Sequence, residues 1–374
     1  MLMSNQAAAT LNDLLDNCAT IQAGQEVLIL AAADGLHGGP NLVDEAVVSW
    51  IQNGVLLRKA QPSVLWVDLP DRPHAWRVPP IVKGALARAD LFITHAFDLP
   101  NEELLELRDL LAEHNVPMVR NMATTVPLLA SAWARTPYEL VSEIRFQTGS
   151  LFQAGLTWHV QCPLGTDLRG AVGAPLDPFK HYGERRTEGS YRPFPEGISM
   201  PVRTTDVEGV IVFDRTSSWW ARYIGVASSF SPPVRLEIRS NRIVSFAGGA
   251  EAKTLERFYS AMAKRFGETV YEISGLHGGV HPRAEVAPHE CPASDYREFI
   301  EHHHTGNVHF HLGRVPRTAE YPYMWHISSE LQGVTWRLGD RLICDQGRLC
   351  TLDRPEVQAI AARYPDRPGI SVES

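Results

Sequence analysis

The sequence predicts an α/β N-terminal domain with a mostly parallel sheet, followed by an α+β C-terminal metal-site domain with a mixed or antiparallel sheet. Strand-like apolar segments alternate with amphipathic helices in the first half, whereas short strands separated by turns dominate the second. Nine of the fifteen histidines lie within residues 271–330. A chain of 374 residues is long enough for two domains, which we place at 1–150 (scaffold) and 151–374 (metal-binding and catalytic).

The first half contains four apolar segments typical of buried strands and four segments with helical periodicity. The strands are expected at 25–30, 63–69, 91–94 and 116–120, and the helices at 11–18, 42–53, 81–89 and 102–113. Gly54 follows the second helix, where a glycine commonly ends a helix in the left-handed conformation. This alternation favours parallel strands covered by helices.

A glycine-rich segment, residues 35–40, follows the first expected strand. It does not match G-x-G-x-x-G, because Pro40 interrupts the pattern, and the chain has no G-x-x-x-x-G-K-[ST]. We therefore interpret the segment as a connecting loop. The domain itself is expected to be a scaffold, a dimerisation domain or a lid rather than a nucleotide-binding unit.

The second half is built mainly from short strands. They are expected at 157–162, 167–172, 207–214, 234–240, 242–247 and 307–313, with a final hairpin in 334–351 and helices at 138–155, 252–266 and 354–364. Ser240 and Asn241 stand between two alternating strands, as in a tight hairpin. Residues 175–201 are rich in Pro, Gly and charge, which predicts an irregular loop.

Composition excludes several classes of partner. The formal charge is −8 and no Lys/Arg run is present, so we expect no nucleic-acid binding. Five cysteines without a C-x-x-C pair indicate a reducing compartment. We expect a cytoplasmic protein with no membrane partner, since no segment resembles a signal peptide or a transmembrane helix.

Imidazole and carboxylate groups recur in the histidine-rich stretch, and together they are the usual ligands of Fe, Zn or Mn. His309 and His311 are two residues apart in an expected strand, so they share a face. That face either lines a metal site or is merely exposed. His326 begins a second strand-like piece in which Ser328 and Glu330 share its face.

Further candidates flank these strands. His277 and His281 stand in a glycine-rich piece, where Arg283 could pair with an anionic substrate group. Glu251, near a helix start, is either a carboxylate ligand or a partner of the helix dipole. Residues His302, His303 and His304 are candidates for acid–base catalysis.

These motifs follow one another in a characteristic order along the chain. The landmarks are Gly165–Leu168, Phe194–Gly197, Val207–Gly209, Gly248–Glu251, Gly275–Ala284, Gly306–Gly313, His326–Leu331 and Trp336–Gly347. In this order the sequence resembles the superfamily that joins aminopeptidase T-type leucyl aminopeptidases and 2,5-dihydroxypyridine 5,6-dioxygenases. The resemblance is stronger from Gly165 onward than in the first 150 residues.

The resemblance implies a metal site. The dioxygenases hold one ferrous ion with two histidines and an aspartate, and one histidine and the aspartate form an H-x-D motif. His326 matches the histidine of that motif, but this chain has Ser328 at the position of the aspartate. At the position of the other histidine it has Gly275. The peptidases hold two metals, and Glu251, His309 and His326 match three of their five ligand positions. The two missing ligands disfavour a complete dinuclear site.

We therefore expect a mononuclear non-haem Fe(2+)-dependent dioxygenase that cleaves a small hydroxylated N-heteroaromatic ring, such as a dihydroxypyridine, with O2. The expected metal ligands are His326, His309, His281 or His277, and Glu251, while Arg283 and His302, His303 and His304 act in catalysis. A hydrolase (aminopeptidase- or amidohydrolase-like) using Zn, Mn or Co is the alternative. A non-catalytic binding subunit is a third hypothesis. A homodimer is also expected from the resemblance.

Overall fold

The first half of the chain supplies four strands of a five-stranded parallel sheet, and their parallel arrangement was expected. The computed structural model describes residues 2–35, 42–68, 77–96, 105–175, 182, 191–197, 201–217, 221, 225–315 and 325–370, so part of the glycine-rich segment lies outside the described residues. The sheet order is β2-β1-β3-β4-β7. Its strands are β1 (Glu26–Ala32), β2 (Gln61–Val67), β3 (Leu91–His95), β4 (Met118–Asn121) and β7 (Tyr191–Phe194).

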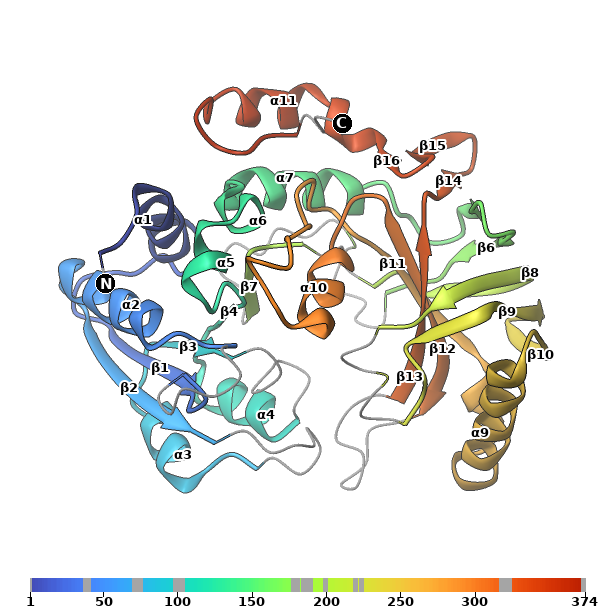
Figure 1. Cartoon of the computed structure of the whole chain (residues 1–374), viewed down its shortest axis with the longest axis horizontal. Coiled ribbons are helices and arrows are strands. Elements are labelled where there is room, and N and C mark those ends of the chain that lie inside the picture. Colours follow the sequence, from blue (N-terminus) through green and yellow to red (C-terminus); the bar gives the residue numbers. More distant parts are fainter. Residues whose placement is uncertain are drawn as a thin grey trace.

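Helices cover both faces of this sheet (Figure 1). The helices of the first half are α1 (Asn5–Asn12), the π-helical η1 (Asp13–Cys18), α2 (Glu45–Leu57), α3 (Pro80–Leu86), α4 (Leu105–His114), α5 (Val126–Ala130), α6 (Ala132–Arg135) and α7 (Tyr138–Gly149). Val27 and Ile29 of β1 pack in one core with Val47 of α2, whereas Leu28 packs in a second core with Val82 of α3. Alternate residues of β1 thus bury against opposite layers.

Three expectations for local structure are corrected. Gly54 does not end α2; it lies inside the helix, where a Cβ would come within 2.3 Å of Leu15 Cδ1, so the glycine permits close packing on η1. The linking helix α7 ends at Gly149 rather than at 155. Residues 175–201 are not wholly irregular, because β7 pairs in parallel with β4 and completes the N-terminal sheet.

The second half contains an eight-stranded antiparallel sheet in the order β10-β9-β8-β6-β5-β14-β15-β16. The strands are β5 (Thr157–Gln161), β6 (Asp167–Val172), β8 (Thr204–Arg215), β9 (Ser229–Arg239), β10 (Arg242–Ala247), β14 (Thr335–Leu338), β15 (Arg341–Asp345) and β16 (Arg348–Leu349). The hairpin between β9 and β10 is confirmed, with φ of 48° at Ser240 and 65° at Asn241. Both values are those of a type I′ turn.

A separate three-stranded antiparallel sheet carries most of the histidines. It consists of β11 (Ile273–Gly278), β12 (Asn307–Val315) and β13 (Trp325–Gln332), with β12 in the middle. The helix α10 (Ser294–Glu301) lies between this sheet and the N-terminal half (Figure 1). Tyr296 and Phe299 of α10 pack in the N-terminal core, and the Tyr296 hydroxyl donates to the Met122 carbonyl. The helix therefore joins the two halves beside the histidines.

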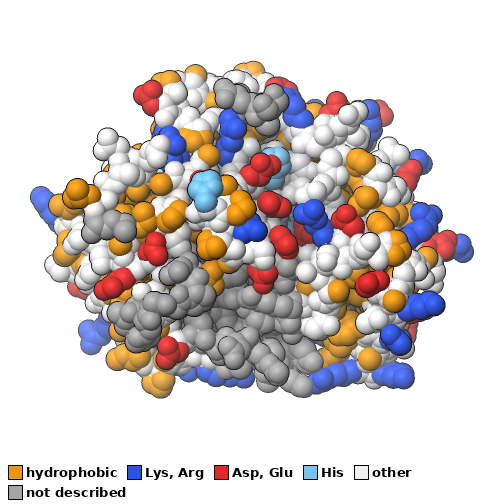
Figure 2. Space-filling model, in the orientation of Figure 1, with side chains coloured by type: hydrophobic (Ala, Val, Ile, Leu, Met, Phe, Trp, Pro, Cys, Tyr) orange, Lys and Arg blue, Asp and Glu red, His pale blue; other side chains and the backbone are white. Residues whose placement is uncertain are grey.

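The remaining elements close the fold at its C-terminal end. They are α9 (Ala250–Phe266), η3 (Glu268–Tyr271), η4 (Cys350–Asp353) and α11 (Pro355–Ala361), which packs on α7. Within the described residues, no helix combines the length and the apolar character needed to cross a membrane. Figure 2 shows acidic and basic side chains interspersed over one face, with little histidine at the surface.

Candidate metal centre

One face of the three-stranded sheet carries a row of potential metal ligands. His309 of β12 pairs with His277 of β11 on one side and with Glu330 of β13 on the other. Directly opposite residues of antiparallel strands project to the same face. All three are at least nine-tenths buried. The register of the strands therefore places two imidazoles and one carboxylate side by side.

A second row lies next to the first on the same face. His311 pairs with Gly275 and Ser328, and its ring stacks on that of His326 with 3.9 Å between centroids. The His277 ring lies 4.5 Å from that of His311 and 4.6 Å from that of His309. The face that carries His309 and His311 is buried, so it is not the exposed face that the sequence offered as the alternative.

His302, the residue that follows α10, lies over this face. His302 caps the helix and places its ring 3.9 Å from that of His309. Two groups result within the described residues whose ligand atoms all lie within 4.8 Å of one another: His277, His309 and His311, and His302, His309 and Glu330. His309 belongs to both groups. The donor sets, three imidazoles or two imidazoles and a carboxylate, suit Fe(II) or Zn(II).

Burial keeps the imidazoles of His309 and His311 neutral. Desolvation lowers the pKa of His309 and His311 well below the ordinary value, and the neighbouring histidines lower both further. A neutral imidazole offers a lone pair to a metal ion, whereas an imidazolium does not. The site therefore presents donor atoms, rather than positive charge, at neutral pH.

Glu330 is held by two hydrogen bonds at one oxygen. Ser217 Oγ donates to Glu330 Oε1 at 2.5 Å, and His302 Nδ1 lies 2.7 Å from the same atom. A carboxylate only accepts, so His302 carries its proton on Nδ1 and its lone pair on Nε2. Ser217 reaches the carboxylate because Thr216, at the end of β8, bridges to Ser329 of β13. The contacts leave Oε2 of Glu330 and Nε2 of His302 as donor atoms.

His281, one of the expected ligands, belongs to neither group. It is fully buried, its backbone N–H donates to the His303 carbonyl, and its Nδ1 accepts from the Arg283 N–H. Burial lowers the His281 pKa to about 3. Arg283, expected to orient a substrate, donates from Nε to the Gly369 carbonyl of the C-terminal tail.

Glu251, the expected carboxylate ligand, is also outside both groups. It lies in the first turn of α9, beside Pro232 and Gly249. Tyr259 of the same helix packs in one core with Leu312, which alternates with His311 and so faces the other side of β12. The place of Glu251 in the first turn of α9 fits its interpretation as a partner of the helix dipole.

The three consecutive histidines of 302–304 have different surroundings. His302 joins the candidate ligands. His303 is buried under Gly197, where a Cβ would lie 2.6 Å from the His303 ring, and against Phe299. His304 accepts from the Gly306 N–H at Nδ1, and its Nε2 lies 3.6 Å from Glu285. Only His302 is placed to act at the candidate centre.

The structure thus brings together His277, His302, His309 and His326 of the expected residues, and it adds His311 and Glu330. His311 lies two residues from the expected ligand His309, and Glu330 lies four residues from the expected ligand His326, so each shares a strand face with that ligand, and this alternation was visible in the sequence. The contribution of Ser217 was not visible, because it depends on β8 reaching the edge of β13.

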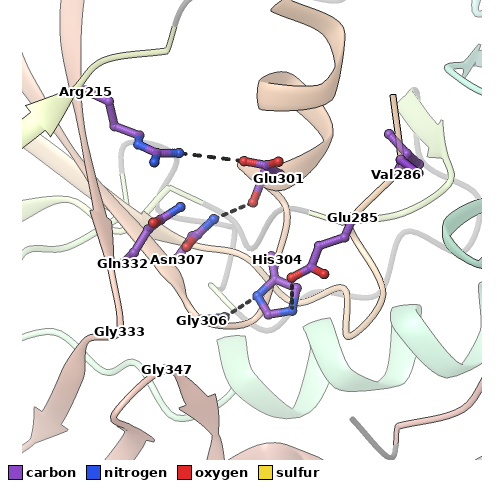
Figure 3. A pocket seen from close by; sticks show the side chains of 11 residues that line it. Arg215, Glu285, Val286, Glu301, His304, Gly306, Asn307, Gln332, Gly333 and Gly347 are labelled. Carbon is purple, nitrogen blue, oxygen red and sulfur yellow. Dashed lines mark hydrogen bonds and ion pairs between the residues drawn. The ribbon is translucent and has the colours of Figure 1, made fainter. Parts of the chain in front are cut away.

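A polar pocket of about 730 Å³ adjoins this face (Figure 3). Its lining residues are Arg215, Glu285, Val286, Ala287, Glu301, His304, Gly306, Asn307, Gln332, Gly333 and Gly347. The Arg215 guanidinium lies 3.7 Å from the Glu301 carboxylate, and Asn307 Nδ2 donates to the Glu301 carbonyl. Asn307 and Gln332 form the cross-strand pair next to His309 and Glu330 on the same face.

These features define the class of protein: a parallel α/β domain joined to an antiparallel β domain that carries a buried group of potential metal ligands. The model of the NicX family, 2,5-dihydroxypyridine 5,6-dioxygenase, matches residues 128–351. Because this is more than half of the 374 residues, the chain belongs to that family.

A solved structure supports the fold. The 2,5-dihydroxypyridine dioxygenase of Pseudomonas putida KT2440 matches with a TM-score of 0.63 and 18% sequence identity, covering 95% of this chain and 100% of that one. No curated protein sequence matches significantly. The expected family resemblance and the expected fold class are both confirmed.

Proposed function

We propose that the chain is a mononuclear Fe(II)-dependent dioxygenase that opens the ring of a small hydroxylated N-heteroaromatic, such as a dihydroxypyridine. Family membership supports a dioxygenase. The observation that carries the iron proposal is the group formed by His302, His309 and Glu330, since two histidines and one carboxylate are the usual ligands of non-haem Fe(II) oxygenases.

The residues around the group determine what it can do. Ferrous iron, when bound, supplies the one-electron chemistry that O2 activation needs. His302, held at Nδ1 by Glu330, presents Nε2 in a fixed tautomer and orientation. The buried rings of His277 and His311 line the same face and exclude bulk water from it. The pocket beside Asn307 and Gln332 offers a route for a polar aromatic substrate.

The experiment is metal analysis and oxygen uptake on protein purified anaerobically. We expect one iron per chain and O2 consumption with 2,5-dihydroxypyridine, with both atoms of isotopically labelled O2 recovered in the ring-opened product. Zinc with anaerobic hydrolysis of peptides or amides would instead support the metallohydrolase alternative, which the three-histidine group of His277, His309 and His311 favours. The O2 measurement separates the two proposals.

The cytoplasmic location and the homodimer stay predictions. Light scattering of the purified protein tests the dimer, and fractionation of cells that express it tests the location. Neither outcome alters the chemistry proposed for the histidine-rich face.

A further inference from the structure

The pocket and the candidate ligands share one face of the three-stranded sheet. Asn307 and Gln332 form the row next to His309 and Glu330. Successive rows on one face are about 6.6 Å apart, because each strand residue advances about 3.3 Å and every second residue faces the same way. That spacing is close to the span of one six-membered ring with substituents at opposite positions.

Two carboxylates, Glu285 and Glu301, stand against one guanidinium, Arg215, in the pocket lining, so the pocket does not favour an anionic ligand. Arg215 faces Glu301 at 3.7 Å, so it is not free to attract a carboxylate substrate, and His304 faces Glu285 (Figure 3). The Gln332 carboxamide makes no hydrogen bond with the described part of the chain, and it is exposed at the pocket. An amide donor and acceptor are therefore available to a neutral, polar ligand.

Glycines form one wall of the pocket. A Cβ on Gly306 would lie 2.7 Å from the Gly347 carbonyl oxygen, and Gly347 itself has φ of +90°. Gly333 lines the same wall with φ of +60°. The lack of side chains at these positions lets the backbone segments that carry Gly306, Gly333 and Gly347 pack closely against one another beside Gln332.

We propose that Gln332 recognises the ring nitrogen of the substrate and its neighbouring oxygen, while the oxygen on the opposite side of the ring points to the row of His309 and Glu330. In its pyridone form, such a ring presents an N–H beside a C=O. The Gln332 carbonyl accepts from that N–H and its amide donates to that C=O. This inference rests on the proposed function and names Gln332 as the residue that selects a ring with a nitrogen beside one of its oxygens.

The test compares two ligands that differ only at this group. Anaerobic titration of the ferrous protein measures the Kd of 2,5-dihydroxypyridine and of benzene-1,4-diol, which keeps both oxygens but lacks the nitrogen. In Gln332→Leu we expect the Kd of the pyridine to rise about 10-fold more than that of the diol, since the hydrogen bond to the ring N–H, which the diol lacks, is worth about that factor. Gln332→Glu keeps an acceptor and should lose less.

The matched control is Gln61→Leu, an exposed strand glutamine of the N-terminal half, which should change neither Kd. Equal weakening of both ligands in Gln332→Leu, or no change in either, would overturn the inference. If Gln332→Leu gives either of these results while the wild-type protein consumes O2 with dihydroxypyridine, only the role of Gln332 is disproved. A wild-type protein that binds neither ligand disproves the proposed function as well.

Discussion

His302 and Glu330 are 28 residues apart in the sequence, yet Nδ1 of the histidine lies 2.7 Å from Oε1 of the glutamate. Both side chains are buried. The pair forms because α10 delivers His302 onto the face of the sheet where β13 presents Glu330. This contact fixes which nitrogen of His302 is free for a metal ion.

Removing the Ser217 hydroxyl should weaken metal binding. Ser217 Oγ donates to Glu330 Oε1, and loss of a partner that orients a ligand typically lowers metal affinity about 10-fold or more. We expect this loss in Ser217→Ala, measured by titration with Co(II) and by the absorption of the Co(II) protein. Ser329→Ala is the matched control, because Ser329 is buried beside Glu330 on the opposite face of β13. Equal affinity of Ser217→Ala and wild type would contradict the prediction.

Replacing His309 should abolish metal binding, since His309 belongs to both candidate groups. We expect His309→Ala to retain only background iron after anaerobic purification, by elemental analysis. Glu251→Ala should retain the wild-type iron content, because Glu251 lies in the first turn of α9, outside both groups. Iron lost from Glu251→Ala and kept in His309→Ala would place the centre elsewhere.

The buried His281 should make the protein less stable as pH falls. Its native pKa is lowered to about 3 by burial and by the nearby His304 and Arg283, whereas the unfolded chain titrates near 6.5. Below pH 6.5 the unfolded state therefore binds a proton that the native state does not. The free energy of unfolding should fall by up to about 1.4 kcal/mol per pH unit from this residue alone, from pH 6.5 towards 3.

The measurement is urea denaturation of wild type and His281→Asn between pH 5 and 7.5. Asparagine keeps an acceptor for the Arg283 N–H but does not titrate. As pH is lowered, the free energy of unfolding of the wild type should fall more steeply than that of His281→Asn. Parallel curves would mean that His281 is solvated enough to protonate in the native state.

The C-terminal tail should contribute to stability through Asp13. Its Oδ2 accepts from Arg367 Nη2 at 2.8 Å and from the Tyr138 N–H at 2.9 Å, and the Asp13 side chain is 1% exposed. Breaking such a buried pair leaves an uncompensated charge, so Asp13→Ala should lose about 3 kcal/mol in urea denaturation.

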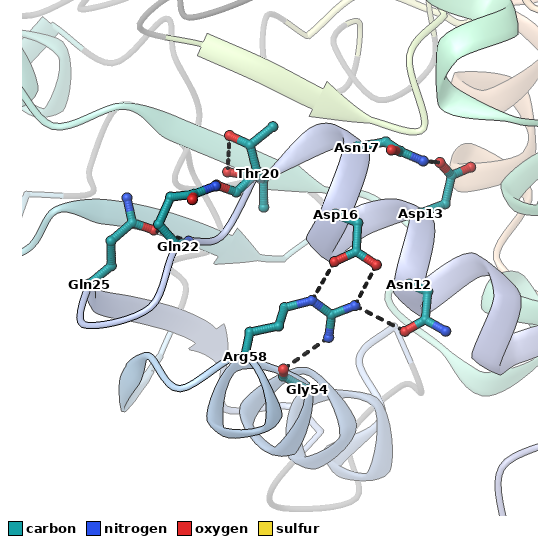
Figure 4. A network of polar contacts seen from close by, with 10 residues as sticks. Asn12, Asp13, Asp16, Asn17, Thr20, Gln22, Gln25, Gly54 and Arg58 are labelled. Atoms are coloured by element: carbon teal, nitrogen blue, oxygen red, sulfur yellow. Dashed lines mark hydrogen bonds and ion pairs between the residues drawn. The ribbon is translucent and has the colours of Figure 1, made fainter.

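The control for this pair is Asp16→Ala, which removes the exposed contact of Asp16 with Arg58 in the same helical region (Figure 4). The Asp16 side chain is 55% exposed, and solvent-exposed ion pairs contribute about 1 kcal/mol or less. Similar losses of unfolding free energy in Asp13→Ala and Asp16→Ala would contradict the prediction that the buried contact of Asp13 with the C-terminal tail contributes more than an exposed ion pair.

The alternation of apolar strands and helices was enough to predict the parallel sheet, because that pattern has few other ways to bury its apolar surface. It did not predict β7, whose four residues lie in a segment rich in proline, glycine and charge and pair with β4 only through tertiary contact. The same holds for Gly54, whose packing on Leu15 is decided by the approach of two helices.

The sequence by itself determined the fold class, the region of the histidine site and the shared face of His309 and His311, since strand alternation is a local property of the backbone. Only the tertiary structure decided which side chains meet. Strand register paired His309 with His277 and Glu330, α10 added His302, and α9 holds Glu251 outside both candidate groups. Such contacts depend on register and packing between segments far apart in the chain, which no local pattern encodes.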